Sequence, residues 1–533
     1  MLYRPALDTA LEEAMTVNDP TSSIGTVAYE ATIADLQAAM EAGTLTAEAL
    51  TVACLERIAA LNRAGPCLNA LIEVSRAALE TAIALDQERA IHGPRSPLHG
   101  IPIVLKDNID TLDDTATTAG SLALLGSRPA SEATVAARLR AAGAVILGKA
   151  NLSEWANFRS TTSSSGWSAR GGQARNPYVL TRSPCGSSSG SAIAVAASLC
   201  VAAIGTETDG SISCPSALCG VVGIKATVGL TSRAGVVPIS STQDTVGPHA
   251  RCVADAATVL GIIAGLDPRD PATAAAAGHA RPDYRSCLQA DALRGARIGV
   301  LRSDRFAGFG RHVERALTTA LMVMRDAGAH VVDPVSLPDE VLSFNDAELT
   351  VLIYEFKAAL NRYLASRVPD PQASVSSPRS LAELIAFNEQ HADQELRFFG
   401  QELLLRAAAA GDLDDPVYQQ ALTASRDASR QALDTLLYEQ QLDALVAPAT
   451  GLAWPIDLIG GDRYPGGSSS LAARAGYPMV TVPAGMAFSL PIAINFIGTA
   501  WSEPMLIRLA YAFEQATRLR EPPTYRQRIE GDD

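Results

Sequence analysis

Two segments rich in serine and glycine hold the residues best suited to nucleophilic chemistry. Residues 183–191 read SPCGSSSGS and precede an apolar helical pattern, whereas residues 205–212 read GTETDGSI and follow the next apolar run. Backbone N–H groups at a helix N-terminus stabilise negative charge. Gly210 lets the backbone bend before Ser211, so several N–H groups could converge as an oxyanion hole requires. The pattern indicates serine-based acyl transfer, and the ordinary alternative is that these serines form turns and helix caps.

A base for such a site could come from three lysines that end apolar runs. They are Lys106, Lys149 and Lys225. A lysine at a strand end beneath a loop can be desolvated, which lowers its pKa and lets the neutral amine accept a proton. Each could equally be a snorkelling or salt-bridged lysine. Spacing alone does not choose among the three.

A different serine would be the nucleophile if the first segment were a nucleophile elbow. Residues 186–190 fit G-x-S-x-G, which would make Ser188 catalytic in an α/β-hydrolase. That motif must follow a strand directly, and residues 176–184 do not form a convincing strand pattern. No HGGG-type segment is present either, so we disfavour this interpretation.

Other kinds of site lack their usual signals. None of the seven histidines forms H-E-x-x-H, and no His/Cys cluster has metal-ligand spacing, so we expect no metal and no cofactor. The formal net charge is −14 and no dense Lys/Arg run occurs, which argues against a nucleic-acid partner. The longest apolar stretch, residues 192–204, is too short to span a bilayer, so we expect no membrane partner.

Hydrophobic periodicity predicts alternating strands and helices. This alternation is typical of an α/β fold, a mixed sheet with helices on both faces. Helical spacing occurs at residues 32–61, 76–92, 132–142 and 191–199. Strand patterns occur at residues 101–105, 144–147, 200–205, 221–225, 297–301, 330–332, 444–447, 479–482 and 492–497.

The chain is predicted to form one large domain. Hydrophobic residues make up 47% of it, which is enough for a large core. We interpret residues 1–30 as a polar lead-in, residues 31–525 as the domain and residues 526–533 as an acidic tail. Residues 337–440 are nearly all helical in pattern and are expected to form a helical insertion or cap.

The cysteines and the N-terminal residues give evidence about the cellular compartment of the protein. None of the eight cysteines forms a C-x-x-C pair, so we expect buried, reduced thiols, with a Cys214–Cys219 bond left open. Residues 1–13 lack the pattern of a signal peptide, which favours the cytoplasm. A removed leader and a periplasmic location also stay open.

The order of the motifs resembles the amidase signature family. The likeness is carried by residues 186–229, which include GTETDGS and CGVVGIK, by LHGIP at 98–102 and VLKDN at 104–108, and by QDTVGP at 243–248. It extends over about residues 32–517. The resemblance implies the amidase signature fold, a mixed twisted sheet covered by helices on both faces, with a helical insertion here.

The resemblance also assigns roles to individual residues. It implies that Lys106 is the base, Ser187 the bridging serine after a cis peptide bond, and Ser211 the nucleophile. Ser188 would support this network. The backbone N–H groups of Thr208, Asp209, Gly210 and Ser211 would then form the oxyanion hole.

The sequence departs from the commonest family pattern at four positions. These are Cys185, Ser189, Glu207 and Asp209. Asp209 matters most, because a carboxylate near an oxyanion would repel it. We expect its side chain to point away while its N–H group points inward.

Segments outside the core signature look like bacterial peptide amidases, which release ammonia from the C-terminal amide of peptides. These segments are residues 151–159, 165–173, 352–357 and 498–504. Asn157 and Tyr354 are candidate substrate contacts, and packing or loop scaffolding is the alternative role for both.

The expected partner is a short-peptide or small-molecule amide, bound by a monomer. Three alternatives stay open. The chain could be an amidase of the same family for small aryl or aliphatic amides. It could also be a glutaminase subunit that channels ammonia to a partner enzyme, or a catalytically inactive binding protein.

Overall fold

The structure is a computed structural model that describes residues 29–302, 310–342, 346–371, 373, 376–529 and 531. Most of the predicted lead-in and three residues of the predicted tail, 530, 532 and 533, lie outside these ranges. In the described part of the chain, no helix is long and apolar enough to cross a membrane.

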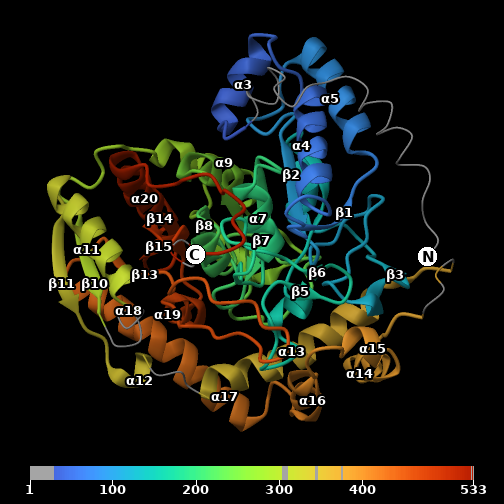
Figure 1. The fold of residues 1–533 in the computed structure, drawn as a ribbon. Helices are drawn as coiled ribbons and strands as arrows, with labels where there is room; N and C mark the ends of the chain where they lie inside the picture. Colours follow the sequence, from blue (N-terminus) through green and yellow to red (C-terminus); the bar gives the residue numbers. More distant parts are fainter. Residues whose placement is uncertain are drawn as a thin grey trace.

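An 11-stranded mixed sheet forms the centre of the molecule (Figure 1). β2 runs parallel to β4 and β7, whereas β9 is antiparallel to β7 and β8. The expected mixed α/β fold is confirmed. In spatial order the strands are β1 (Leu71–Val74), β4 (Val145–Ala150), β2 (Pro102–Lys106), β7 (Ala202–Glu207), β9 (Thr245–Ala250), β8 (Val222–Lys225), β14 (Met479–Ala487), β15 (Leu490–Ile497), β13 (Ala444–Pro448), β10 (Arg297–Leu301) and β11 (His330–Val335).

The central strands are buried along their whole length. Every residue of β2, β4, β7 and β9 is buried. Strands covered on both faces bury both sets of side chains, and their sequences therefore read as nearly continuous apolar runs. Lysines near the ends of these strands, Lys106 and Lys149, are therefore buried in the core.

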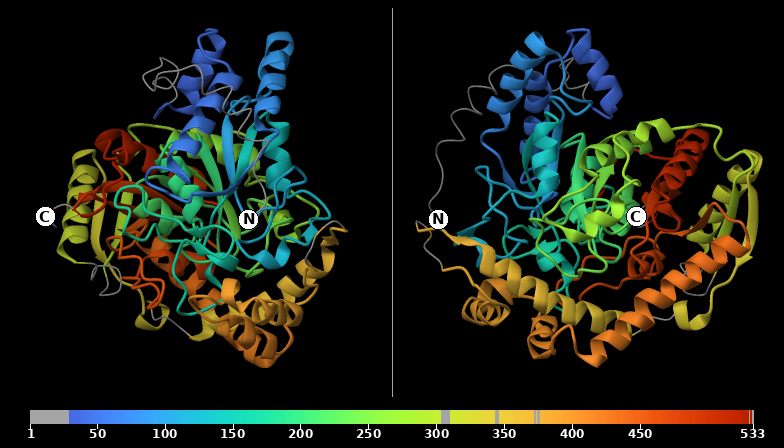
Figure 2. Two further views of the ribbon diagram at one scale, coloured as in Figure 1. Left: turned by 45° about the vertical axis from the view of Figure 1, so that its right-hand side comes forward. Right: turned by 180° about the vertical axis from the view of Figure 1, so that it is seen from behind.

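Helices pack on both faces of the sheet (Figure 2). α7 joins the first serine-rich segment to β7, and α8 follows the second. The helices around the sheet are α3 (Ile33–Glu41), α4 (Ala47–Leu61), α5 (Ala78–His92), α6 (Thr134–Ala141), α7 (Ser189–Ala196), α8 (Ser213–Leu218), α9 (Val253–Ile263), α11 (Arg311–Asp326), α19 (Ser469–Ala475) and α20 (Glu503–Thr517). Single 3-10 turns occur at η1 (Leu122–Leu124), η2 (Glu154–Asn157), η3 (Pro271–Ala276) and η4 (Tyr284–Cys287).

A run of helices lies along one side of the sheet, at the bottom of Figures 1 and 2. Its apolar side chains form a separate cluster that also takes in Trp155 and Phe158 from the segment after β4. We call residues 339–439 the helical segment. It comprises α12 (Asp339–Leu342), α13 (Asp346–Ser366), α14 (Leu381–Gln390), α15 (Ala392–Glu395), α16 (Glu402–Ala409), α17 (Pro416–Leu422), the π-helical turn η5 (Thr423–Asp427) and α18 (Ala428–Glu439), with β12 (Val368–Pro369) paired to β3 (Ser127–Arg128).

The structure differs from the predicted elements in a few places. The helical pattern at 32–61 is two helices, because the chain turns at Gly43, whose φ is +71°. β9 was not predicted, since Gly247 and Pro248 lie inside it and both residues are unfavourable in strands. The long serine-rich loop also contains a small hairpin, β5 (Trp167–Ser168) with β6 (Gly172–Gln173).

The expectation for the cysteines was wrong at two positions. Cys185 and Cys214 form a disulfide, with their Cα atoms 5.9 Å apart, and Cys219 is free and buried. Cys214 lies in α8 and Cys219 directly follows it, so the helix points the two side chains to different sides. The fold instead brings the loop before α7 against Cys214, and the bond joins the two serine-rich segments.

Candidate active site

Lys106 contacts a serine of the first segment. It is the last residue of β2, and its Nζ lies 2.7 Å from Ser187 Oγ. Nζ is also 2.8 Å from Thr206 Oγ1 and 3.3 Å from the Thr206 carbonyl oxygen, at the end of neighbouring β7. Both Lys106 and Ser187 are fully buried. The sheet therefore places an amine directly against the first serine-rich segment.

The other two strand-end lysines have structural partners. Lys149 Nζ donates to the Ile109 carbonyl and to Thr117 Oγ1, each at 2.7 Å. Lys225 Nζ donates to the Tyr477 carbonyl at 2.7 Å. Geometry therefore singles out Lys106, which the spacing of the lysines could not do.

The protonation of Lys106 is set mainly by its burial. Desolvation lowers its pKa to about 7, although the carboxyl groups of Asp244 and Glu207 oppose this shift. Near neutral pH a large share of Lys106 is the uncharged amine, which can accept a proton. Thr206 can take up the amine's own hydrogens, so the lone pair is available to the Ser187 hydroxyl.

Ser187 and Ser188 begin the turn into α7. The Gly186–Ser187 peptide bond is cis, as the family resemblance implies. Ser188 Oγ donates to the Thr206 carbonyl at 3.0 Å and accepts the Thr206 N–H at 3.2 Å. Its N–H donates to the Ser211 carbonyl at 3.1 Å, so Ser188 ties the two serine-rich segments together.

The nucleophile-elbow interpretation of Ser188 does not fit this geometry. No strand precedes the segment within residues 176–184. The Ser188 hydroxyl is fully buried and engaged with the backbone of β7. A buried hydroxyl group with backbone partners does not have the exposure that a nucleophile elbow gives its serine.

Ser211 is the more accessible of the two candidate serines. It is 8% exposed, whereas Ser187 is 0% exposed. Within the described residues, no hydrogen bond joins the two hydroxyl groups. Catalytic hydrogen bonds are often long before substrate binds, so this spacing is compatible with a relay.

The loop between β7 and α8 presents unengaged N–H groups. Gly210 has φ +79°, a conformation that glycine adopts freely. None of the N–H groups of residues 208–211 donates a hydrogen bond to another residue of the described ranges. The Asp209 carboxylate accepts hydrogen bonds from Ser469 Oγ at 2.5 Å and Ser470 Oγ at 2.6 Å. Those carboxylate oxygens are thus engaged by hydroxyl groups of α19.

Two carboxyl groups, buried Glu207 and half-buried Asp244, hold the ends of this loop. Glu207 accepts the N–H groups of Ile212 and Ser213 at 2.7 and 2.8 Å, at the start of α8, and burial raises its pKa. Asp244 accepts the Thr208 hydroxyl at 2.6 Å. Burial raises the pKa of Asp244 to about 6.

Some of these residues were not singled out from the sequence. Thr206 lies inside GTETDGS and Asp244 inside QDTVGP, so their place in these motifs was the available signal. Ser469 and Ser470 gave no signal, because only the folded chain brings α19 beside residue 209.

The two candidate substrate contacts lie in other surroundings. Asn157 Oδ1 accepts the Ser163 hydroxyl at 2.8 Å. Tyr354 donates its hydroxyl to Asp415 at 2.8 Å and stacks on Tyr418, with ring centroids 5.8 Å apart. Neither residue hydrogen-bonds to the Lys106, Ser187 or Ser211 side chains, and their roles in substrate binding stay predictions.

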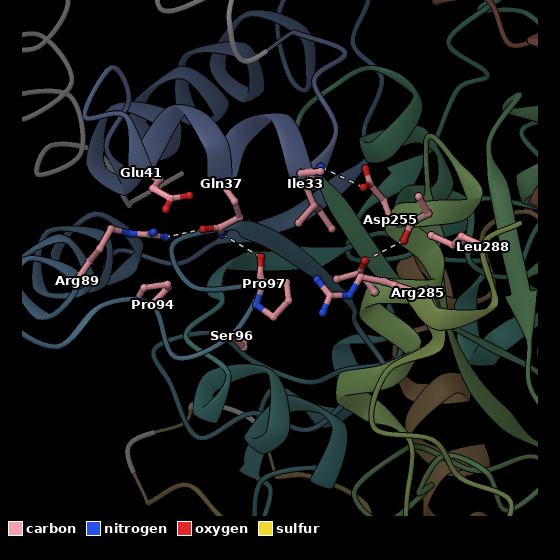
Figure 3. A pocket seen from close by; sticks show the side chains of 13 residues that line it. Ile33, Gln37, Glu41, Arg89, Pro94, Ser96, Pro97, Asp255, Arg285 and Leu288 are labelled. Atoms are coloured by element: carbon pink, nitrogen blue, oxygen red, sulfur yellow. Dashed lines mark hydrogen bonds between the residues drawn. The ribbon is translucent and has the colours of Figure 1, made fainter. Parts of the chain in front are cut away.

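A cavity of about 400 Å³ lies elsewhere, between α3, α9 and the loop before β2 (Figure 3). Gln37, Pro97 and Asp255 are among its lining residues. None of the predicted catalytic or substrate-binding residues lines it. The cavity is therefore separate from the candidate site.

Comparisons with known proteins place the chain in a family. The family model described as Amidase matches residues 49–507. A probable amidase of Arabidopsis thaliana is 44% identical over 504 residues, covering 93% of this chain and 92% of that protein. The chain therefore belongs to the amidase family, and it is an amide-hydrolysing enzyme.

Two further relatives carry different names. The solved structure of native peptide amidase from Stenotrophomonas maltophilia is 54% identical, covers 93% of this chain and 99% of its own, and superposes with a TM-score of 0.87. A glutamyl-tRNA(Gln) amidotransferase subunit of Chloroflexus aurantiacus is 37% identical over 523 residues, covering 94% of this chain and 99% of that protein.

Proposed function

We propose that this protein is a peptide amidase, a serine hydrolase that releases ammonia from the C-terminal amide of short peptides. The contact of Lys106 with Ser187, in a setting where burial lowers the pKa of the amine to about 7, carries this proposal. The likeness to the Stenotrophomonas maltophilia peptide amidase supports the choice of substrate. We expect the protein to act as a monomer and without a cofactor.

The reaction proceeds through an acyl-enzyme. Neutral Lys106 accepts the proton of Ser187, Ser187 accepts the proton of Ser211, and the Ser211 oxygen attacks the amide carbon. The carbonyl oxygen becomes an oxyanion held by the N–H groups of residues 208–211, each worth about 3 kcal/mol in comparable sites. Ser187 passes a proton to the amide nitrogen, the C–N bond breaks, and ammonia leaves.

Water completes the cycle by the same relay. It attacks the acyl carbon while its proton moves through Ser187 to Lys106. The Ser211–acyl bond breaks, Ser211 regains a proton, and the peptide leaves with a free C-terminal carboxyl group.

Ammonia release from a C-terminally amidated dipeptide tests the assignment. We expect turnover by the wild type and a loss of about 10³-fold or more in Ser211→Ala and in Ser187→Ala. Ser286→Ala, at an exposed 3-10 turn, serves as the matched control and should keep full activity. Undiminished turnover by Ser211→Ala would overturn the assignment of the nucleophile.

A glutaminase subunit is the second candidate, favoured by the amidotransferase relative. Parallel assays with glutamine, a benzamide-type amide and the dipeptide amide separate the alternatives. Preference for the dipeptide amide by the isolated chain, eluting as a single monomeric species, supports a peptide amidase. Preference for glutamine or for the aryl amide would reject that substrate assignment.

A further inference from the structure

Two carboxyl groups meet beside the candidate oxyanion loop, and one of them comes from the helical segment. Asp209 lies between β7 and α8, whereas Glu348 lies in the first turn of α13. Glu348 is 5% exposed and shares a hydrogen bond with Asp209. Two carboxyl groups can hydrogen-bond to each other only if the pair holds a proton.

The proton of this pair belongs to Glu348. Burial, followed by the nearby charge of Asp209, raises the pKa of Glu348 to about 8. Asp209 is half-buried and accepts the hydroxyl groups of two serines. Near neutral pH, Glu348 is therefore a neutral acid that donates to the Asp209 carboxylate.

The remaining contacts of Glu348 lead to the same loop. Its Oε1 accepts a hydrogen bond from Gln243 Nε2 at 3.0 Å. The same Nε2 lies 3.4 Å from the Thr208 carbonyl oxygen. The helical segment thus contacts residue 209 directly and residue 208 through Gln243.

An unrestrained aspartate at this position would compete with the oxyanion. Aspartate side chains readily accept a hydrogen bond from the backbone N–H two residues further on. For Asp209 that N–H belongs to Ser211, one of the proposed oxyanion donors. A carboxylate bound there would fill the hole with its own negative charge.

We propose that Glu348 is a positioning residue, which as a protonated acid holds the Asp209 carboxylate off the N–H groups of residues 208–211. The inference rests on the proposed function and extends it to the helical segment. Activity then needs neutral Lys106 and protonated Glu348 together. The working pH window is bounded by loss of the neutral amine below about 7 and of the acid's proton above about 8.

Other charged groups surround the pair. Arg474 of α19 faces Glu348 and favours its ionised form. Lys225 of β8, Glu207 of β7 and Tyr464 interact electrostatically with Asp209. Burial lowers the pKa of Lys225 to about 8, so Lys225 also titrates at alkaline pH. The test must therefore assign the alkaline limb to a particular residue.

The test measures kcat and KM from pH 5 to 10 on the amide that the wild type hydrolyses fastest. We expect a bell-shaped wild-type profile. In Glu348→Gln the amide N–H still donates to Asp209 and cannot ionise, so the acid limb should stay and the alkaline limb should disappear. Glu348→Leu removes the donor and should lower kcat about tenfold with little change in KM.

Glu355→Gln is the matched control. Glu355 is an equally buried carboxylate of α13 that accepts the hydroxyl groups of Ser240 and Tyr418 instead of contacting Asp209. This variant should keep the alkaline limb. In an Asp209→Ala background the cost of Glu348→Leu should vanish, because no carboxylate is left to restrain.

Two results would overturn the inference. One is an alkaline limb that persists in Glu348→Gln, which would point to Lys225. The other is a folded Glu348→Leu protein with wild-type kcat, where folding is checked by its melting temperature. Ser211→Ala separates failure of this inference from failure of the proposed function. Its loss of turnover tests the nucleophile alone, because that loss does not depend on the residue at position 348.

Discussion

At the scale of single residues, the proposed chemistry depends on one desolvated amine. Lys106 is buried to the same degree as Lys149 and Lys225, but only Lys106 ends against a serine of the two serine-rich segments. Burial by itself favours an uncharged amine. Contact with a hydroxyl group whose proton can move makes that amine a base.

Replacing Lys106 tests this difference. Lys106→Met keeps most of the side-chain volume and removes the amine, so we expect kcat to fall about 10²- to 10⁴-fold, as for loss of a general base. Lys149→Met, an equally buried variant with only structural partners, is the matched control. Turnover is measured after each variant's melting temperature shows that it is folded. Equal losses in both folded variants would contradict a special role for Lys106.

The proposed mechanism assigns the expected acid limb of the rate profile to the same amine. Because burial lowers the pKa of Lys106 to about 7, the neutral form predominates above that pH and is lost as the pH falls. Wild-type kcat should therefore decline about tenfold per pH unit well below 7. A pH–rate series between 5 and 7 checks this, and a flat profile down to pH 5 would argue against a lysine base.

The proposed catalytic residues were only partly predictable from residue types. Ser187 and Ser211 stood in segments whose glycines and helix starts indicated anion binding, whereas Lys106 needed the family resemblance. Glu348 could not be found, because 139 positions separate it from Asp209 and no local pattern reports such a contact. The structure also shows that Thr206 accepts a hydrogen bond from Lys106 and that Asp244 accepts one from Thr208.

At the scale of elements, the site depends on two loops that flank α7 and β7. These loops are joined by the Ser188 N–H to the Ser211 carbonyl and by the Cys185–Cys214 disulfide. Strands β2, β7 and β8 were predictable because they are continuous apolar runs. β9 was not, because its pairing with two neighbours outweighs the low strand propensity of Gly247 and Pro248.

Removing the disulfide should loosen these loops. The two cysteines are 29 positions apart, and closing a loop of that size stabilises a folded chain by about 3–4 kcal/mol. We expect the Cys185→Ser/Cys214→Ser variant to melt at a lower temperature, in an assay under oxidising conditions. Cys219→Ser is the control, since Cys219 is buried and free. An unchanged melting temperature for the double variant would show that the bond does not contribute.

At the scale of the whole molecule, the helical segment and the sheet meet through buried polar contacts as well as apolar ones. Glu355 accepts hydrogen bonds from Ser240 and from the Thr242 backbone, next to Asp244. Arg159, which follows β4, is fully buried and donates to Glu154 Oε1 at 2.7 Å and to the Glu395 carbonyl. These contacts join α13 to the residues before β9, and α15 to the residues after β4.

Arg159 is a fully buried cation. We expect its replacement to destabilise the helical segment before the sheet. Its guanidinium lies over the Phe399 ring at 4.2 Å and within 4.0 Å of the Glu395 carboxylate. Arg159→Met would leave buried Glu154 and Glu395 without their cation, and removing one partner of a buried pair typically costs about 3–5 kcal/mol. We expect faster amide hydrogen exchange in α14 to α16 than in β2 and β7, together with lower kcat. Arg285→Met is the control, because Arg285 is exposed and its ion-pair partner among the described residues is the solvent-accessible side chain of Asp283. Exchange that rises equally in sheet and helical segment would mean that Arg159 stabilises the fold as a whole rather than this junction.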